Sequence, residues 1–183
     1  MGTKKIAVIV GSLRKGSFSR KLAEVLIAAA PGTLEMKIVE IAGLPLYNQD
    51  SDDAPPEVYT RFREALIGFD GFLFVTPEHN RSVPAALKNA LDVGSRPYGR
   101  NAWSGKPGAV ISVSIGAIGG FGANHHLRQT LAFLNIPVMP QPEAYIGNAG
   151  DLFGSYGELV NNSTLEFIAK FIQSFAAWVA RNS

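Results

Sequence analysis

The fold of this chain is decided by the stretch Ile6-Ala-Val-Ile-Val-Gly-Ser-Leu-Arg-Lys-Gly-Ser-Phe-Ser-Arg20. Its first five residues, 6–10, are apolar without alternation, which is typical of a strand buried on both faces of a parallel sheet. Gly11 ends that run, and a helical pattern follows it, with apolar residues at Leu22, Val25, Leu26 and Ala29. The stretch therefore predicts a strand, a tight loop and a helix whose N-terminus points back at the loop.

The loop of this stretch has the composition of an anion site. Its hydroxyl and cationic side chains are Ser12, Arg14, Lys15, Ser17, Ser19 and Arg20. Unpaired backbone N–H groups and the positive end of the helix dipole favour phosphate at such a junction. The glycine patterns of dinucleotide and nucleoside triphosphate loops are absent, so a terminal phosphate monoester fits better. The alternative interpretation is a turn whose serines only cap the helix.

Composition limits the function classes. With 183 residues, 46% of them hydrophobic and 17% charged, the chain is expected to form one α/β domain over residues 1–183. There are no cysteines and only three histidines, so we expect no disulfides, no iron–sulfur cluster and no metal site. Redox chemistry would therefore need a bound cofactor.

Charge and hydropathy restrict the partners. The formal net charge is only +2 and the basic residues are dispersed, so we expect no nucleic-acid partner. The apolar run at residues 6–10 is too short for a signal peptide, and no segment is long enough to span a bilayer. We therefore expect a cytoplasmic protein with no membrane partner.

Strand and helix patterns alternate along the chain. The predicted strands are residues 6–10, 35–41, 71–76, 108–114 and 143–146, and the later predicted helices are residues 57–67, 84–92, 123–135 and 158–180. This alternation predicts a flavodoxin-like three-layer α/β sandwich, with a five-stranded parallel sheet in the order 2-1-3-4-5 and helices on both faces.

Two of the helices carry stripes that predict which side faces the core. The inward residues expected for helix 57–67 are Val58, Phe62, Ala65 and Leu66. Those expected for helix 158–180 are Leu165, Ile168, Phe171, Ile172, Phe175 and Val179.

The same topology predicts where a ligand binds. Open parallel sheets bind ligands at the carboxyl ends of their strands, beside the point where the strand order reverses. The loops that follow Val10, Val75 and Ser114 meet there, and these three loops have the most unusual chemistry in the sequence.

The second of these loops carries a recognisable signature, Thr76-Pro-Glu-His-Asn-Arg-Ser-Val-Pro-Ala-Ala-Leu-Lys-Asn-Ala-Leu-Asp92. It strongly resembles the Pro-Glu-Tyr-Asn-x-Ser-x-Pro-x-x-Leu-Lys-Asn-Ala-x-Asp motif of the NADPH-dependent FMN reductase family, flavodoxin-like enzymes that include chromate and quinone reductases. Residues 11–20 resemble the phosphate loop of that family, and residues 114–120 resemble its third flavin loop. The resemblance extends over nearly the whole chain.

The resemblance implies an FMN site. It assigns the phosphate to Ser12, Arg14, Ser17 and Ser19. It assigns the ribityl chain and the isoalloxazine ring to Pro77, Glu78, His79, Asn80 and Ser82. It assigns the other ring edge to Ser114, Gly116, Gly119 and Gly120. The alternative for these glycines is a flexible strand-to-helix connection.

The resemblance also implies an activity. NADPH or NADH would be the co-substrate that passes hydride to N5 of FMN, and free flavin, quinones, azo compounds or chromate would accept the electrons. The alternative is an FMN-binding electron carrier without pyridine-nucleotide activity.

One residue departs from the family motif, because His79 stands where tyrosine is usual. An imidazole in that place could donate a proton to the electron acceptor, or it could only fill the space of the tyrosine. The neighbouring pair His125 and His126 opens a predicted helix, and we expect a surface or interface role for it.

Related enzymes are homodimers or homotetramers with flavin sites near the subunit boundary, so the resemblance implies a homo-oligomer. The apolar residues considered for the contact are Leu87, Leu91, Val93 and Trp103.

Overall fold

The structure is a computed structural model that describes residues 2–154 and 156–183. Its sheet has five parallel strands in the order β2-β1-β3-β4-β5, as expected from the sequence. The strands are β1 Lys4–Val10, β2 Leu34–Val39, β3 Gly71–Thr76, β4 Gly108–Val113 and β5 Ala144–Ile146. The α-helices are α1 Phe18–Ala28, α2 Glu57–Ile67, α3 Ala85–Gly94, α4 Phe121–Phe133 and α5 Asn162–Asn182, and two short 3-10 helices are η1 Gln49–Ser51 and η2 Ala149–Asp151.

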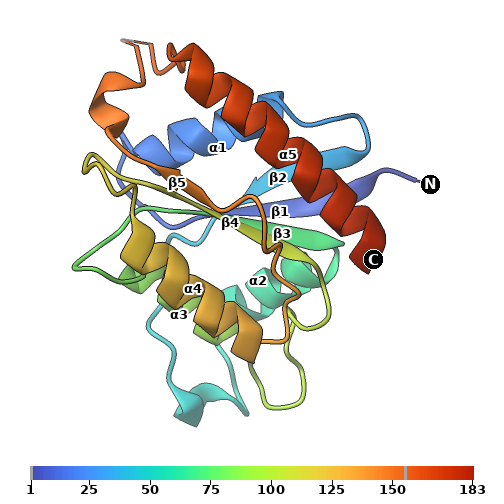
Figure 1. The fold of residues 1–183 in the computed structure, drawn as a ribbon. Coiled ribbons are helices and arrows are strands. Elements are labelled where there is room, and N and C mark those ends of the chain that lie inside the picture. The colour runs from blue at the N-terminus through green and yellow to red at the C-terminus, as the bar shows by residue number, and fades with distance from the viewer. Residues whose placement is uncertain (1, 155) are drawn as a thin grey trace.

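The sheet separates two apolar layers, which explains the unalternating strand sequences. In β1, Ile6 and Val8 pack into one layer, whereas Ala7 and Ile9 pack into the other, and all four are fully buried. Helices α1 and α5 cover the first layer, while α2, α3 and α4 cover the second (Figure 1). A strand with helices on both sides has no solvent face and therefore no polar positions to alternate with.

Two residues expected in the core lie outside it. Ala65 of α2 is exposed, and Leu165 of α5 retains 38% of its accessible surface. Helix α5 starts later than the sequence pattern predicts, because Asn161 caps it with a side-chain oxygen that accepts the N–H of Thr164 at 2.9 Å. Leu165 therefore lies in the first turn of the helix, whereas the deeply buried stripe begins at Ile168.

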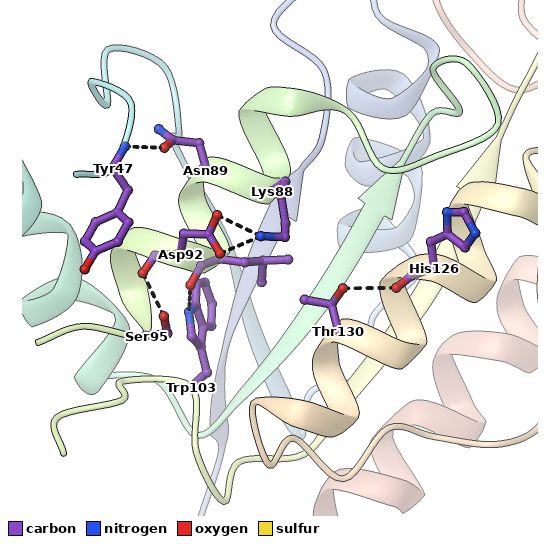
Figure 2. Close-up of polar contacts among 9 residues, drawn as sticks. Tyr47, Lys88, Asn89, Asp92, Ser95, Trp103, His126 and Thr130 are labelled. Atoms are coloured by element: carbon purple, nitrogen blue, oxygen red, sulfur yellow. Dashed lines mark hydrogen bonds and ion pairs between the residues drawn. The ribbon is translucent and has the colours of Figure 1, made fainter. Parts of the chain in front are cut away.

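The residues considered for a subunit contact belong to the core of the protomer instead. Leu87, Leu91, Val93 and Trp103 are all fully buried within one chain. The indole Nε1 of Trp103 donates to the backbone carbonyl of Leu91 at 3.0 Å (Figure 2). Any contact between subunits must therefore use other side chains.

No helix in the described part of the chain combines the length and the apolar character needed to cross a membrane.

Candidate functional site

A cavity of about 510 Å³ lies at the carboxyl ends of β1, β3 and β4. The three loops singled out in the sequence meet there, together with the start of α3. Its lining residues are Gly11, Ser12, Leu13, Arg14, Ser17, Phe18, Ser19, Pro77, Glu78, His79, Pro84, Ala85, Ala86, Val113, Ser114 and Ile115. This volume lies within the range of cofactor sites.

The floor of the cavity is the N-terminus of α1, where two serines are buried. Ser17 is the N-cap, and its Oγ accepts the N–H of Arg20 at 3.3 Å. Ser19 is only 1% exposed, and within the described chain its Oγ has no hydrogen-bond partner. The first turn of α1 contains no acidic side chain to neutralise the helix dipole. A buried unpaired hydroxyl at such a helix end fits a phosphate group, so capping explains Ser17 but not Ser19.

Two further serines shape the loops. The Oγ of Ser12 accepts the N–H of Arg14 at 3.4 Å, and the Oγ of Ser114 accepts the N–H of Gly116 at 3.1 Å. Each bond tightens a turn directly after a strand and leaves the hydroxyl hydrogen to donate elsewhere. Arg14 is an exposed residue of the cavity lining, while Arg20 is paired with Glu40 beyond β2 and is not part of the lining.

The loop after β3 contributes unequally to the cavity. Pro77, Glu78 and His79 all line it, but the carboxylate of Glu78 accepts the backbone N–H of Ala123 in α4 at 3.0 Å. Asn80 and Ser82 lie outside the lining. Asn80 belongs to a turn closed by reciprocal backbone bonds between His79 and Ser82, and it has a left-handed φ of 49°. The hydroxyl of Ser82 lies 3.1 Å from Nδ1 of His126.

The three glycines of the loop after β4 also lie outside the lining. Gly119 has a φ of 61°, and a Cβ there would approach the carbonyl carbon of Tyr145 to 2.6 Å. Gly120 is the N-cap of α4, and a Cβ there would approach the Cβ of Ser112 to 3.1 Å. Gly119 and Gly120 therefore let the start of α4 pack closely on the sheet. Gly116 has a different role: its N–H donates to the Oγ of Ser114, and its carbonyl accepts the N–H of Gly119 at 3.2 Å.

Several lining residues were missed by the sequence interpretation. Leu13 and Ile115 follow Ser12 and Ser114, and they are 56% and 74% exposed at the cavity mouth. The available signal was a serine shortly after the end of a strand that is followed directly by an apolar residue, a pattern repeated in the loops after β1 and β4. Phe18, Ala85 and Ala86 give no such signal, because they resemble ordinary first-turn helix residues.

Tyr145 of β5 lies next to the glycine loop, and its pKa is shifted strongly from the ordinary value of tyrosine. Burial, followed by the neighbouring carboxylate of Glu143, raises the pKa of Tyr145 to about 12. Its hydroxyl lies 2.9 Å from Nε2 of His125, which is exposed on α4. Among the described residues, no cluster of histidine and acidic side chains is arranged to hold a metal ion.

The fold is that of a flavodoxin-like α/β protein, with a cavity at the switch point of its sheet. The model of the NADPH-dependent FMN reductase family matches residues 4–151. The chain belongs to this family of enzymes, which use FMN as cofactor and NAD(P)H as reductant.

Two relatives and one solved structure support this membership. A "Quinone reductase" from Pseudomonas putida is 61% identical over 97% of this chain and 95% of its own length. A "2-hydroxy-1,4-benzoquinone reductase" from Burkholderia sp is 48% identical, over 96% of each chain. Among solved structures, the flavoenzyme NAD(P)H:(acceptor) oxidoreductase FerB from Paracoccus denitrificans has a TM-score of 0.92 and 39% identity, over 98% of this chain and 99% of its own.

Proposed function

We propose that this enzyme uses NAD(P)H and FMN to reduce quinones. The observation that carries the proposal is the make-up of the cavity. A buried Ser19 hydroxyl without a hydrogen-bond partner among the described residues lies at a helix N-terminus, and Leu13 and Ile115 form an apolar mouth. The first feature suits a phosphate, and the second suits a flat, apolar acceptor. The names of the two relatives above support the same acceptor class.

Four residues would hold the phosphate of FMN. Ser17 and Ser19 would donate their hydroxyl hydrogens, and the first backbone N–H groups of α1 would point at the same anion. Arg14 would add a positive charge from the exposed side, and Ser12 would complete the set. The terminal dianion would fix the orientation of the cofactor, with its ring toward the loops after β3 and β4.

The ring end would lie between Pro77 and His79 on one side and Ser114 on the other. When bound, FMN supplies the hydride-accepting and electron-donating chemistry of the reaction. The protein orients the reactants and leaves one face open to the nicotinamide and then to the acceptor. Asn80, Ser82, Gly116, Gly119 and Gly120 would act indirectly, because they fix the shape of the two loops.

His79 is the proposed proton donor to the acceptor. It is an exposed residue of the cavity lining, so an acceptor at the open face could reach its imidazole. Reduction of a quinone to a hydroquinone consumes two electrons and two protons. This uptake equals one hydride and one proton: the hydride equivalent would come from the reduced cofactor, and the proton would come from this imidazole, which would regain it from solvent.

The decisive experiment follows the two half-reactions separately. The purified protein should carry FMN, and anaerobic NADH or NADPH should bleach it within a catalytic turnover. One equivalent of 1,4-benzoquinone should then restore the oxidised spectrum. Flavin that NAD(P)H does not bleach would indicate an electron carrier instead. Free flavin, azo compounds and chromate serve as comparison acceptors, and we expect each to reoxidise the protein more slowly than the quinone.

We also propose that the enzyme is a homodimer or a homotetramer. Support comes from a second hollow of about 670 Å³ between α3 and α4, where Tyr98 and Phe133 are 90% and 89% exposed. Figure 2 shows residues of this groove, with Lys88 and Asp92 on α3, Ser95 at the C-cap of α3 and Thr130 on α4. Phe133→Glu should shift sedimentation toward the monomer, while a parent protein that is monomeric at micromolar concentration would contradict the proposal.

A further inference from the structure

Glu78 lies in the loop after β3, which lines the cavity, but its carboxylate forms a hydrogen bond to helix α4. The side chain is only 11% exposed. Oε2 accepts the backbone N–H of Ala123 at 3.0 Å, and Oε1 lies 3.3 Å from the guanidinium of Arg81. The two bonded residues belong to different elements, because Ala123 is in α4 and Arg81 is in the turn after β3.

Helix α4 depends on this contact for its capping. Its N-cap is Gly120, which has no side chain to accept a backbone N–H, and its first turn contains no acidic residue. A negative charge near a helix N-terminus and an acceptor for its unpaired N–H groups both stabilise the first turn. Glu78 provides both from a loop 45 residues earlier in the chain.

The surrounding packing is fitted to the same contact. A Cβ at Gly122 would lie 2.8 Å from the carbonyl oxygen of Arg81 and 2.9 Å from Oε2 of Glu78. Only glycine leaves room for the carboxylate to reach the helix. On the next turn of α4, His126 contacts the hydroxyl of Ser82. The segment 78–82 therefore lies against α4 at both of its ends.

We propose that Glu78 is a positioning residue for FMN. Helix α4 continues the loop that begins at Ser114, so the bond from Glu78 to Ala123 links two walls of the cavity. The link fixes the distance between the Pro77–His79 edge and the Ser114–Ile115 edge, where the ring of the cofactor is assigned. This inference rests on the proposed function, because it takes the cavity to be the FMN site.

Two substitutions at position 78 separate positioning from charge. Glu78→Gln keeps an oxygen that accepts the N–H of Ala123 but removes the negative charge. Glu78→Ala removes both. Arg81→Ala is the matched control, since it breaks the ion pair on the exposed side and leaves the bond to Ala123 in place. Far-UV circular dichroism establishes that each variant is folded.

The measurements are amide hydrogen exchange in the first turn of α4 in the FMN-free protein and the dissociation constant of FMN from fluorescence titration. Glu78→Ala should raise the exchange rate of Ala123 and weaken FMN binding, each by about tenfold, which is the usual effect of one hydrogen bond to a charged group. Glu78→Gln and Arg81→Ala should both stay within about threefold of the parent, as expected where only a partly exposed charge interaction is lost.

Three results would overturn the inference. One is faster exchange at Ala123 in Glu78→Ala with unchanged FMN affinity, which would make the contact purely structural. Another is a glutamine variant as weak as the alanine variant, which would mean that the charge acts directly. The third is unchanged exchange in Glu78→Ala. A parent protein that binds no FMN would instead refute the proposed function, and the exchange data would remain interpretable.

Discussion

The side-chain oxygen of Asn89 accepts the backbone N–H of Tyr47 at 2.8 Å, which ties α3 to the loop after β2 (Figure 2). The same amide donates to the carbonyl oxygens of Leu44 and Pro45 at 3.2 and 2.8 Å. Asn89 is a buried residue of the helix, so its three bonds replace water for the loop backbone. Helix α3, whose first residues line the cavity, is thereby fixed to the loop between β2 and η1.

Replacement of Asn89 should therefore destabilise the protein. Asn89→Leu removes the partner of the Tyr47 N–H and of the Leu44 carbonyl, while the carbonyl of Pro45 keeps its bond from the hydroxyl of Tyr59. We expect the free energy of unfolding to fall by about 1–3 kcal/mol. Urea denaturation measures it. The control is the neighbouring Lys88→Ala, which removes a half-exposed ion pair with Asp92 and should cost less than about 1 kcal/mol. Equal losses in the two variants would contradict this account.

Ser19 and Ser17 should respond differently to alanine substitution. Ser19→Ala removes a hydroxyl that has no hydrogen-bond partner in the part of the chain that the structure describes. The stability of the FMN-free variant should therefore be unchanged or slightly higher, while FMN binding weakens by about tenfold. Ser17→Ala should weaken FMN too, but it also removes the cap of α1 and should cost about 1 kcal/mol of stability. Thermal unfolding without FMN and fluorescence titration with FMN distinguish the two. Parent-like FMN affinity in Ser19→Ala would remove the phosphate assignment.

The proton-donor proposal for His79 predicts an effect on one half-reaction only. His79→Tyr restores the residue that is usual in the family. If the imidazole donates the proton, the variant should reduce quinone more slowly at neutral pH and lose the decline toward alkaline pH, while the rate of flavin reduction by NAD(P)H stays the same. Stopped-flow measurements of both half-reactions test this. Identical pH profiles in the two proteins would leave His79 with a packing role.

Tyr145 should make stability depend on pH in the alkaline range. Its pKa in the folded protein, about 12, lies above the ordinary value of about 10, so folding favours the neutral phenol. That contribution is complete below about pH 10 and is lost as the pH rises toward the folded-state pKa. Between pH 9 and pH 11, a range around the ordinary tyrosine pKa of about 10, the free energy of unfolding should therefore fall less in Tyr145→Phe than in the parent. Urea midpoints at several pH values measure the difference, and parallel curves would argue against it.

The architecture was predictable because its signals are local. Residues 6–10 are apolar without alternation since two helical layers cover β1, and that property is visible in the sequence itself. The strand order followed from the alternation of elements, and the location of the cavity followed from the strand order. Eight of the residues assigned to the FMN site line the cavity. They are Ser12, Arg14, Ser17, Ser19, Pro77, Glu78, His79 and Ser114.

What the sequence could not predict depends on contacts between distant residues. Glu78 caps a helix that starts 43 residues later, and nothing in its own loop indicates that partner. Arg20 appears as a loop cation until the position of β2 brings Glu40 to it. For apolar residues such as Leu91 and Trp103, the sequence does not indicate whether they are buried in the core of one protomer or in a contact between subunits.

Because three loops meet at one cavity, the supply of cofactor affects how long the protein stays folded. A ligand that touches the ends of β1, β3 and β4 together can bind only the folded chain. At a free FMN concentration of about 100 times its dissociation constant, this linkage would add about 2.7 kcal/mol to the free energy of unfolding. A cell short of flavin would therefore hold less of this enzyme, because its unfolded fraction, and with it proteolysis, would increase.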